Sequence, residues 1–193
     1  MKLIKKFVAS LLSLVMVLSF SSVAFAATPE TPSDEQWYTL YTTIPENAEI
    51  LQSTETLLYF NANTCEQITE AQSKSLDPRE LFVIKADHTS YQMPGGKIDF
   101  GIELTATSTR CRIKKISGSV TQKDQNSSAS STFSIRQSAL VPDYHFGAYF
   151  NGKKSFTVGH TVKVSWNYYI TLVSGSILNG GRMTGSHTTP IVG

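Results

Sequence analysis

The stretch TVKVSWNYYITLVS, residues 161 to 174, decides the fold of this chain. Successive side chains of a β-strand point to opposite faces, so a strand with one buried face alternates apolar and polar residues. We therefore predict one long strand whose apolar face is covered by a second layer of sheet, with Trp166 buried and Tyr169 on the solvent face. The apolar or aromatic residues occupy every even position, namely Val162, Val164, Trp166, Tyr168, Ile170 and Leu172.

Residues 97 to 107 alternate in the same way, which predicts a second amphipathic strand with one face in the core and one in water. Asp99 and Glu103 fall on its polar face. Paired carboxylates are the groups that hydrolyse glycosidic bonds, but four residues along a strand separate these two by roughly 13 Å. That separation is too large for either glycosidase geometry, and we expect both side chains on a solvated outer face.

Residues 110 to 122 are a third strand candidate in which the phase changes. Ile113 occupies an odd position and Ile116 an even one, and one face of a regular strand cannot bury both. An inserted residue restores the match, so we predict a β-bulge near Lys114 and Lys115. The alternative is a strand that ends there and crosses to a second sheet.

One helix is predicted, over residues 63 to 75. Asn63 is a good N-cap residue, and Glu66 three positions later completes a capping-box pattern. Helix-forming residues follow, and Pro78 ends the segment. Cys65 would then lie in the first helical turn.

Strands repeated at short spacing, with glycine turns between them and a single helix, predict a mainly β fold. We predict an antiparallel β-sandwich that forms one domain over residues 37 to 193. Its best-marked module, residues 110 to 192, resembles the immunoglobulin-like sandwiches of small exported proteins in Gram-positive bacteria. The resemblance rests on a strand with ISGSV (116–120), a polar tip, a Phe-containing strand, Asn151-Gly152, FTVG (156–159) and the long aromatic strand.

The first 26 residues have the order of a secretory signal peptide. A basic start precedes an uncharged stretch, residues 7 to 20, and the small-x-small sequence Ala24-Phe25-Ala26 ends the segment. The uncharged stretch is shorter than the roughly 20 residues that span a bilayer. We expect cleavage after Ala26, a flexible acidic leader over residues 27 to 36, and a secreted protein with no membrane attachment.

Charge is distributed unevenly along the chain after residue 26. Residues 27 to 109 contain 13 acidic and 4 basic residues, whereas residues 110 to 193 contain 10 basic and 2 acidic. The two halves either interleave in one sheet system and neutralise each other, or form a dipolar surface. Such a surface would steer the protein toward an anionic polymer or a second copy. No basic run or recognition motif indicates nucleic acid.

Cys65 and Cys111 are the only cysteines. An even count in an exported chain favours a disulfide, which would close a loop of about 47 residues and contribute roughly 4 kcal/mol in the chain-entropy model. The alternatives are two unpaired thiols, or a Cys65 nucleophile activated at a helix start with a histidine base.

No metal or cofactor site is expected, because none of the four histidines shows zinc-protease spacing: His88, His145, His160 and His187. Exposed aromatic side chains could form a stacking platform for sugars, and the candidates are Trp37, Tyr38, Tyr41 and Tyr169. We therefore predict an extracellular binding module whose partner is a cell-wall polymer or another extracellular protein. The alternative functions are an exported wall hydrolase that uses Cys65 and a self-associating surface protein.

Overall fold

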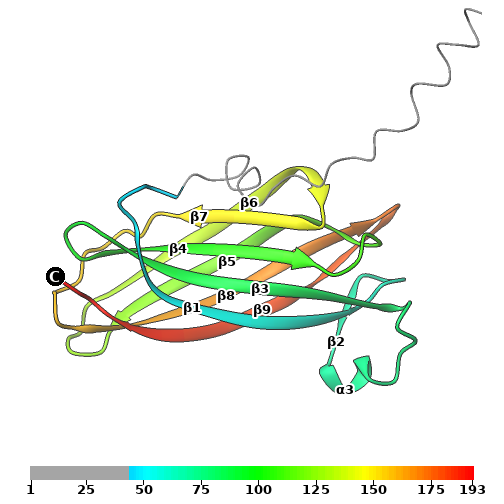
Figure 1. Cartoon of the computed structure of the whole chain (residues 1–193), viewed down its shortest axis with the longest axis horizontal. Coiled ribbons are helices and arrows are strands. Elements are labelled where there is room, and N and C mark those ends of the chain that lie inside the picture. Colours follow the sequence, from blue (N-terminus) through cyan, green and yellow to red (C-terminus); the bar gives the residue numbers. More distant parts are fainter. Residues whose placement is uncertain (1–43) are drawn as a thin grey trace, which may run out of the picture. The chain divides into compact units, whose positions relative to one another are not determined.

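A computed structural model describes residues 44–193 of the chain, which form two antiparallel β-sheets packed as a sandwich (Figure 1). In sheet A the strand order is β2-β1-β3-β4-β7, with bounds β1 Glu49–Asn61, β2 Glu66–Ile68, β3 Leu81–Met93, β4 Lys97–Ala106 and β7 His145–Phe150. In sheet B it is β6-β5-β8-β9, with bounds β5 Arg112–Asp124, β6 Ser130–Asp143, β8 Thr161–Ser174 and β9 Ile177–Pro190. The predicted fold class, a mainly β sandwich with one short helix, is confirmed. The signal peptide and the acidic leader lie outside the described residues.

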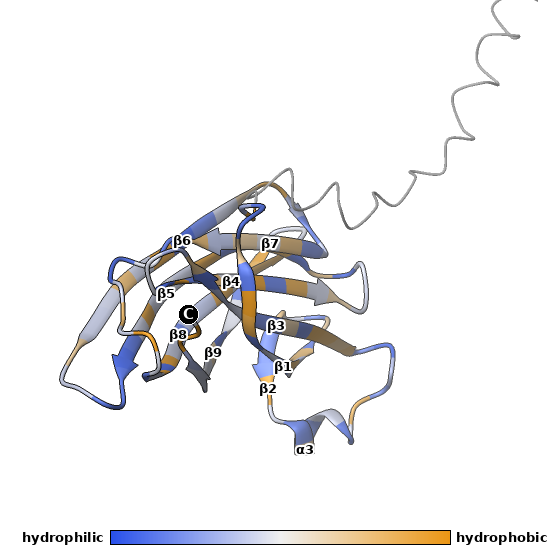
Figure 2. Ribbon diagram, turned by 60° about the vertical axis from the view of Figure 1, so that its left-hand side comes forward, coloured by the Kyte–Doolittle hydropathy of each residue, from blue (hydrophilic) through white to orange (hydrophobic). Residues whose placement is uncertain are grey.

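Strand β8 is the predicted spine, and it lies between β5 and β9 in sheet B. All six even-numbered side chains are buried, and the decisive contrast is Trp166 at 3% exposure against Tyr169 at 42%. The Trp166 ring packs on Phe100 of β4, with ring centroids 5.6 Å apart. The apolar stripe of β8 therefore faces the stripe of β4 across the sandwich, and Figure 2 shows the alternation of polar and apolar residues along the strands.

The predicted β-bulge is confirmed in β5. The pairing register of β5 with both β6 and β8 shifts between Ile113 and Lys115. As a result, Ile113 and Ile116 are both fully buried although they differ in sequence phase.

The predicted helix over residues 63 to 75 is wrong in its extent. The helix α3 is only Glu70–Ser73, and both views place it outside the two sheets (Figures 1 and 2). Its capping box is formed by Thr69 and Gln72 and not by Asn63 and Glu66, the pair that the sequence indicated. Glu66 belongs instead to β2, which pairs with β1.

The segment before β2 is a tight turn rather than a helix start. The side-chain oxygen of Asn61 accepts hydrogen bonds from the backbone N–H of Asn63 and Thr64. Cys65 then has a φ of 53°, a left-handed conformation that interrupts any right-handed helix. Tertiary pairing therefore overrides the local helix signal.

Candidate functional site

The two halves of the chain form different layers of the sandwich. Sheet B is built only from residues after 110, and sheet A from residues before 110 with the exception of β7. Apart from β7, the strands of the two halves therefore do not interleave in one sheet. The strands of sheet A hold six carboxylates and two lysines. The strands of sheet B hold two carboxylates and seven basic residues, which are Arg112, Lys114, Lys115, Lys123, Arg136, Lys163 and Arg182.

Strand register places most of these cations on the outer surface of sheet B, because the inward positions are apolar. We call this surface the basic face and define it by Arg112, Lys115, Lys123, Arg136, Lys163 and Arg182. Between the cations the face consists of rows of hydroxyl and amide groups. Reading from β6 through β5 and β8 to β9, two of the rows are Thr132–Thr121–Ser165–Ser186 and Ser134–Ser119–Asn167–Thr184.

The two carboxylates of sheet B do not neutralise the basic face. Asp124 is buried at 2% exposure, and its Oδ2 lies 2.8 Å from His160 Nδ1 and 2.7 Å from Ser127 Oγ. The hydrogen bond with His160 is the main reason that the pKa of Asp124 is lowered to about 2. Asp143 is the last residue of β6, where its side chain accepts a hydrogen bond from the backbone N–H of Tyr144.

Lys123 and Lys163 are direct cross-strand partners on the basic face. Like charges directly opposite each other in an antiparallel pair destabilise the sheet. Over residues 44–193, neither ammonium forms an ion pair with a carboxylate. This arrangement favours an external anion, which would offset the repulsion.

The centre of the basic face is hollowed around Gly118. Its walls are side chains of β5, β8 and β9, including Ser117, Ser119, Tyr169 and Arg182. Tyr169 is the one member of the predicted aromatic platform that the structure describes. The other three, Trp37, Tyr38 and Tyr41, lie outside the described residues.

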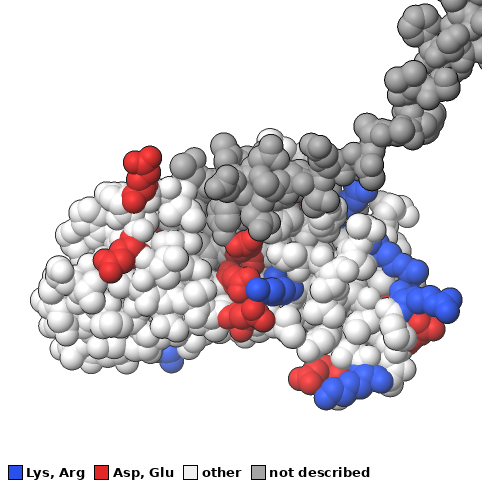
Figure 3. Space-filling model, viewed as in Figure 1, with Lys and Arg blue, Asp and Glu red and all other residues white. Residues whose placement is uncertain are grey.

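The outer surface of sheet A is acidic, but its central carboxylates lie beside basic side chains of the same sheet. Glu55, Asp87 and Glu103 are cross-strand neighbours in one row, and Figure 3 shows carboxylates gathered across the middle of this surface. Lys85 Nζ lies 2.9 Å from Glu55 and 3.4 Å from Asp87. His145 Nε2 lies 3.2 Å from Glu103. Two carboxylates of the row are therefore paired with Lys85, and the third lies beside the His145 ring.

The expectation that Asp99 lies on a solvated face is wrong. Asp99 is fully buried, because Tyr149 and the segment after β7 cover it. The Tyr149 hydroxyl donates to Asp99 Oδ2 at 2.7 Å, and the backbone N–H of Gly152 donates to Oδ1 at 2.7 Å. Burial, together with the Asp99 carboxylate, raises the pKa of Tyr149 above its usual range. Asp99 therefore fixes the turn after β7, and only Glu103 retains part of its predicted exposure.

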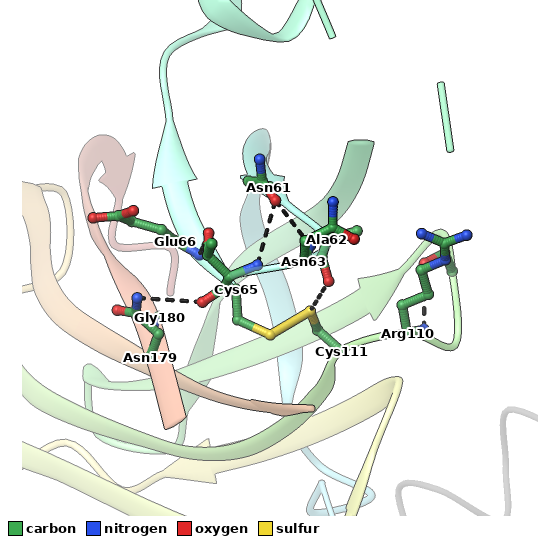
Figure 4. Close-up of a disulfide and its surroundings, with 11 residues drawn as sticks. Asn61, Ala62, Asn63, Cys65, Glu66, Arg110, Cys111, Asn179 and Gly180 are labelled. Carbon is green, nitrogen blue, oxygen red and sulfur yellow. Dashed lines mark hydrogen bonds between the residues drawn. A yellow bond between two sulfur atoms is a disulfide. The ribbon is translucent and has the colours of Figure 1, made fainter. Parts of the chain in front are cut away.

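Cys65 and Cys111 form the predicted disulfide, with their Cα atoms 6.3 Å apart (Figure 4). Both residues are fully buried. The bond joins the turn after β1 to the residue that precedes β5, and so ties sheet A to sheet B. The hydrolase hypothesis required a free Cys65 thiol beside a histidine, and the bonded sulfur does not meet this requirement.

The sequence did not reveal a buried polar cluster in the core. Residues 87 to 90 are all polar, but β3 continues through them and places His88 and Ser90 inward. His187 Nε2 lies 2.7 Å from Ser90 Oγ, and its Nδ1 lies 3.1 Å from Thr54 Oγ1. The even-numbered phase of Phe82, Ile84 and Ala86 continues to His88 and could have indicated its burial.

In the described part of the chain, no three His, Cys, Asp or Glu residues are arranged to hold a metal ion. The same residues include no helix with the length and apolarity needed to cross a membrane. Comparisons with protein-family models, with curated proteins and with solved structures find no match. The functional inference therefore depends on the surface chemistry of the sandwich.

Proposed function

We propose that this protein is exported and acts outside the cell as a binding module that docks its basic face onto an anionic cell-wall polymer. The observation that carries the proposal is the segregation of charge between the two sheets. Cations spread over four strands, with hydroxyl rows between them, suit an extended polyanion better than a small ligand. The hydroxyl and amide groups add hydrogen bonds to polymer oxygens.

Export is supported by the order of the first 26 residues and by the disulfide. Disulfides form and persist in oxidising compartments and are rare in reducing ones. A signal peptide cleaved after Ala26 would deliver the chain to such a compartment. Mass spectrometry of the protein from culture medium tests this part, because a secreted chain that begins at Ala27 is expected.

The binding proposal is tested with immobilised polygalacturonate, a linear polyanion. Affinity should fall as salt rises from about 50 mM to about 500 mM, because salt screens exposed charges. A Lys123→Gln/Lys163→Gln double variant should bind several-fold more weakly than the wild type. The matched control is Lys74→Gln/Arg79→Gln, which removes two exposed charges beside α3 and should bind as the wild type does.

Two results would overturn the binding proposal. One is an affinity that does not depend on salt. The other is equal weakening of the basic-face variant and the α3-side control, which would show only a dependence on total charge. Thermal unfolding of each variant shows that the comparison is made between folded proteins.

A second candidate function is self-association, because the sandwich carries an acidic surface on sheet A and the basic face on sheet B. Contact between two different surfaces of identical copies is heterologous and extends into open assemblies unless it closes a ring. Lys85 and His145 already pair with the acidic row, so this attraction is weaker than that of a free polyanion. Light scattering at low and high salt tests self-association. A protein that is monomeric at both salt concentrations would contradict it.

A further inference from the structure

We infer that the hollow at Gly118 is a subsite for a sugar ring that carries a negatively charged substituent. This inference rests on the proposed function and names the ligand class that the basic face would take. Three features of the hollow lead to it: an exposed backbone floor, an exposed aromatic ring and a guanidinium without a carboxylate partner. Each has a separate structural cause.

The floor of the hollow is the exposed backbone of β5 at Gly118, which pairs with the inward-facing Tyr168 and has no room for a Cβ. A Cβ added there would collide with the backbone of Asn167 and Tyr168 on the neighbouring strand. Glycine inside a strand weakens it and often marks a place where a ligand or another backbone comes close. Gly118 is exposed although it is in the middle of β5, a strand next to the spine of sheet B.

Tyr169 supplies the aromatic wall. Its Cε1 atom lies 3.1 Å from the position that a Cβ of Gly180 would occupy, so the ring leans over the bare backbone of β9. The ring is thereby supported from below, while 42% of the residue stays exposed. An exposed ring with an apolar face and a polar hydroxyl is suited to stacking on the C–H face of a pyranose.

Arg182 supplies the charge and is the cross-strand partner of Tyr169. Its backbone is clamped by the side-chain amide of Gln67, which accepts from Arg182 N at 2.7 Å and donates to Arg182 O at 3.2 Å. Across residues 44–193, its guanidinium has no carboxylate partner. A guanidinium binds carboxylate or phosphate through two parallel hydrogen bonds.

The rim of the hollow completes the match to a sugar. Ser117, Ser119 and Asn167 present hydroxyl and amide groups that can donate to or accept from ring hydroxyls. A polyanion without rings would use Arg182 but leave Tyr169 without a role. A neutral sugar would use Tyr169 but leave the guanidinium unpaired. An acidic sugar uses both, and its charge is either a carboxylate or a phosphate.

The test separates ring from charge with four immobilised probes. Polygalacturonate has rings with carboxylates, phosphomannan has rings with phosphates, fully methyl-esterified polygalacturonate has rings without charge, and poly-glutamate has charge without rings. Preference between the first two identifies the acidic group. Tyr169→Ala should lower the affinity for the preferred acidic sugar polymer about fivefold, in line with a single stacking contact, and leave poly-glutamate binding unchanged. Tyr169→Phe keeps the ring and should bind as the wild type does.

Arg182→Gln has a matched control in Arg136→Gln. The two arginines are in the same register row, but Arg136 is on β6, outside the hollow. Arg182→Gln should weaken acidic-sugar binding more than Arg136→Gln does, while the two should have equal effects on poly-glutamate. Neither should change the binding of the methyl ester.

The outcomes distinguish the subsite from the proposed function. If all charged probes bind and Tyr169→Ala changes none of them, the subsite is overturned and the basic face stands. The subsite also fails if Tyr169→Ala weakens poly-glutamate as much as the acidic sugars. If no charged probe binds the wild type at low salt, the proposed function fails and the subsite fails with it. Thermal unfolding of each variant confirms that the fold is retained.

Discussion

His88 on β3 and Tyr168 on β8 are joined across the interface of the two sheets, with 2.8 Å between Nε2 and the phenol oxygen. Both residues are buried, at 0% and 1% exposure. Burial lowers the pKa of His88 to about 4 and raises that of Tyr168 above its usual range. Both groups are therefore uncharged, and the hydrogen bond joins a neutral phenol to a neutral imidazole. The His88 ring also stacks on Trp166, with centroids 4.3 Å apart.

Stability should fall in acid because two core histidines resist protonation. Burial lowers the pKa of His88 and of His187 to about 4, whereas the unfolded value is about 6.5. The unfolded state therefore takes up protons first, so the stabilisation is complete above about pH 6.5 and is lost as the pH falls toward 4. The fully buried His88 changes the free energy of unfolding by about 1.4 kcal/mol per pH unit within that window, and the half-buried His187 changes it by less because solvent screens it. Urea unfolding should show a combined slope above about 1.4 and below about 3 kcal/mol per pH unit.

The control for this slope is a His88→Leu variant, which removes one titrating group. Its stability at neutral pH is lower, but its slope between about pH 6 and pH 4.5 should be half that of the wild type or less, because only His187 remains. Asp124 does not contribute in this range, because its lowered pKa makes it lose stabilisation only below about pH 4. Equal slopes in the variant and the wild type would contradict the assignment.

Tyr168→Phe tests the hydrogen bond itself. The substitution keeps the ring that fills the core but leaves His88 Nε2 without its hydrogen-bond partner in a buried environment. An unsatisfied buried donor or acceptor costs about 1–3 kcal/mol, and the loss should be seen in the free energy of unfolding at neutral pH. Tyr169→Phe, one position along and on the solvent face, is the matched control and should change stability by less than about 0.5 kcal/mol. If Tyr168→Phe leaves the free energy of unfolding unchanged, the hydrogen bond makes no net contribution to stability.

The disulfide between Cys65 and Cys111 should contribute strongly to stability. It restricts a loop of 46 residues in sequence separation, for which chain entropy gives about 4 kcal/mol. A Cys65→Ser/Cys111→Ser variant should unfold at a temperature lower by on the order of 10 °C. Because both sulfurs are buried, a reductant should act on the wild type only at temperatures where the protein opens. A double variant as stable as the wild type would contradict this prediction. It would show that the packing of the two sheets stabilises the region around Cys65 and Cys111 without the disulfide.

The strands could be predicted from the sequence because the alternation of side chains is a local property. The buried stripe around Trp166 and the bulge near Lys115 both follow from period and phase alone. The helix was misplaced because Asn63 and Glu66 satisfy a local capping rule. Pairing of β2 with β1 and the left-handed Cys65 then decided the structure. Propensity is a weak signal when tertiary contacts compete with it.

The sequence predicts only part of the candidate site. The sequence shows the excess of basic residues after position 110. Whether these residues lie on one surface depends on which strands join which sheet. The hollow depends on the alignment of Gly118, Tyr169 and Arg182 across three strands. No pattern within one strand encodes that alignment, because register between strands is set by the whole sandwich.

Lys163→Glu should separate stability from binding. The substitution converts the repulsive pair with Lys123 into an attractive one, and cross-strand pairs of opposite charge contribute about 0.2–1 kcal/mol. The variant should therefore unfold at slightly higher urea than the wild type at low salt, while its affinity for polygalacturonate falls. The matched contrast is Lys85→Glu on sheet A, where the lysine already lies between Glu55 and Asp87. There the same change should lower stability and leave binding unaffected. A repulsive pair whose removal stabilises the protein and weakens its binding is what a binding surface predicts, since function at such sites costs stability. If the Lys163→Glu variant loses stability and binds as the wild type does, the Lys123–Lys163 pair has no role in binding.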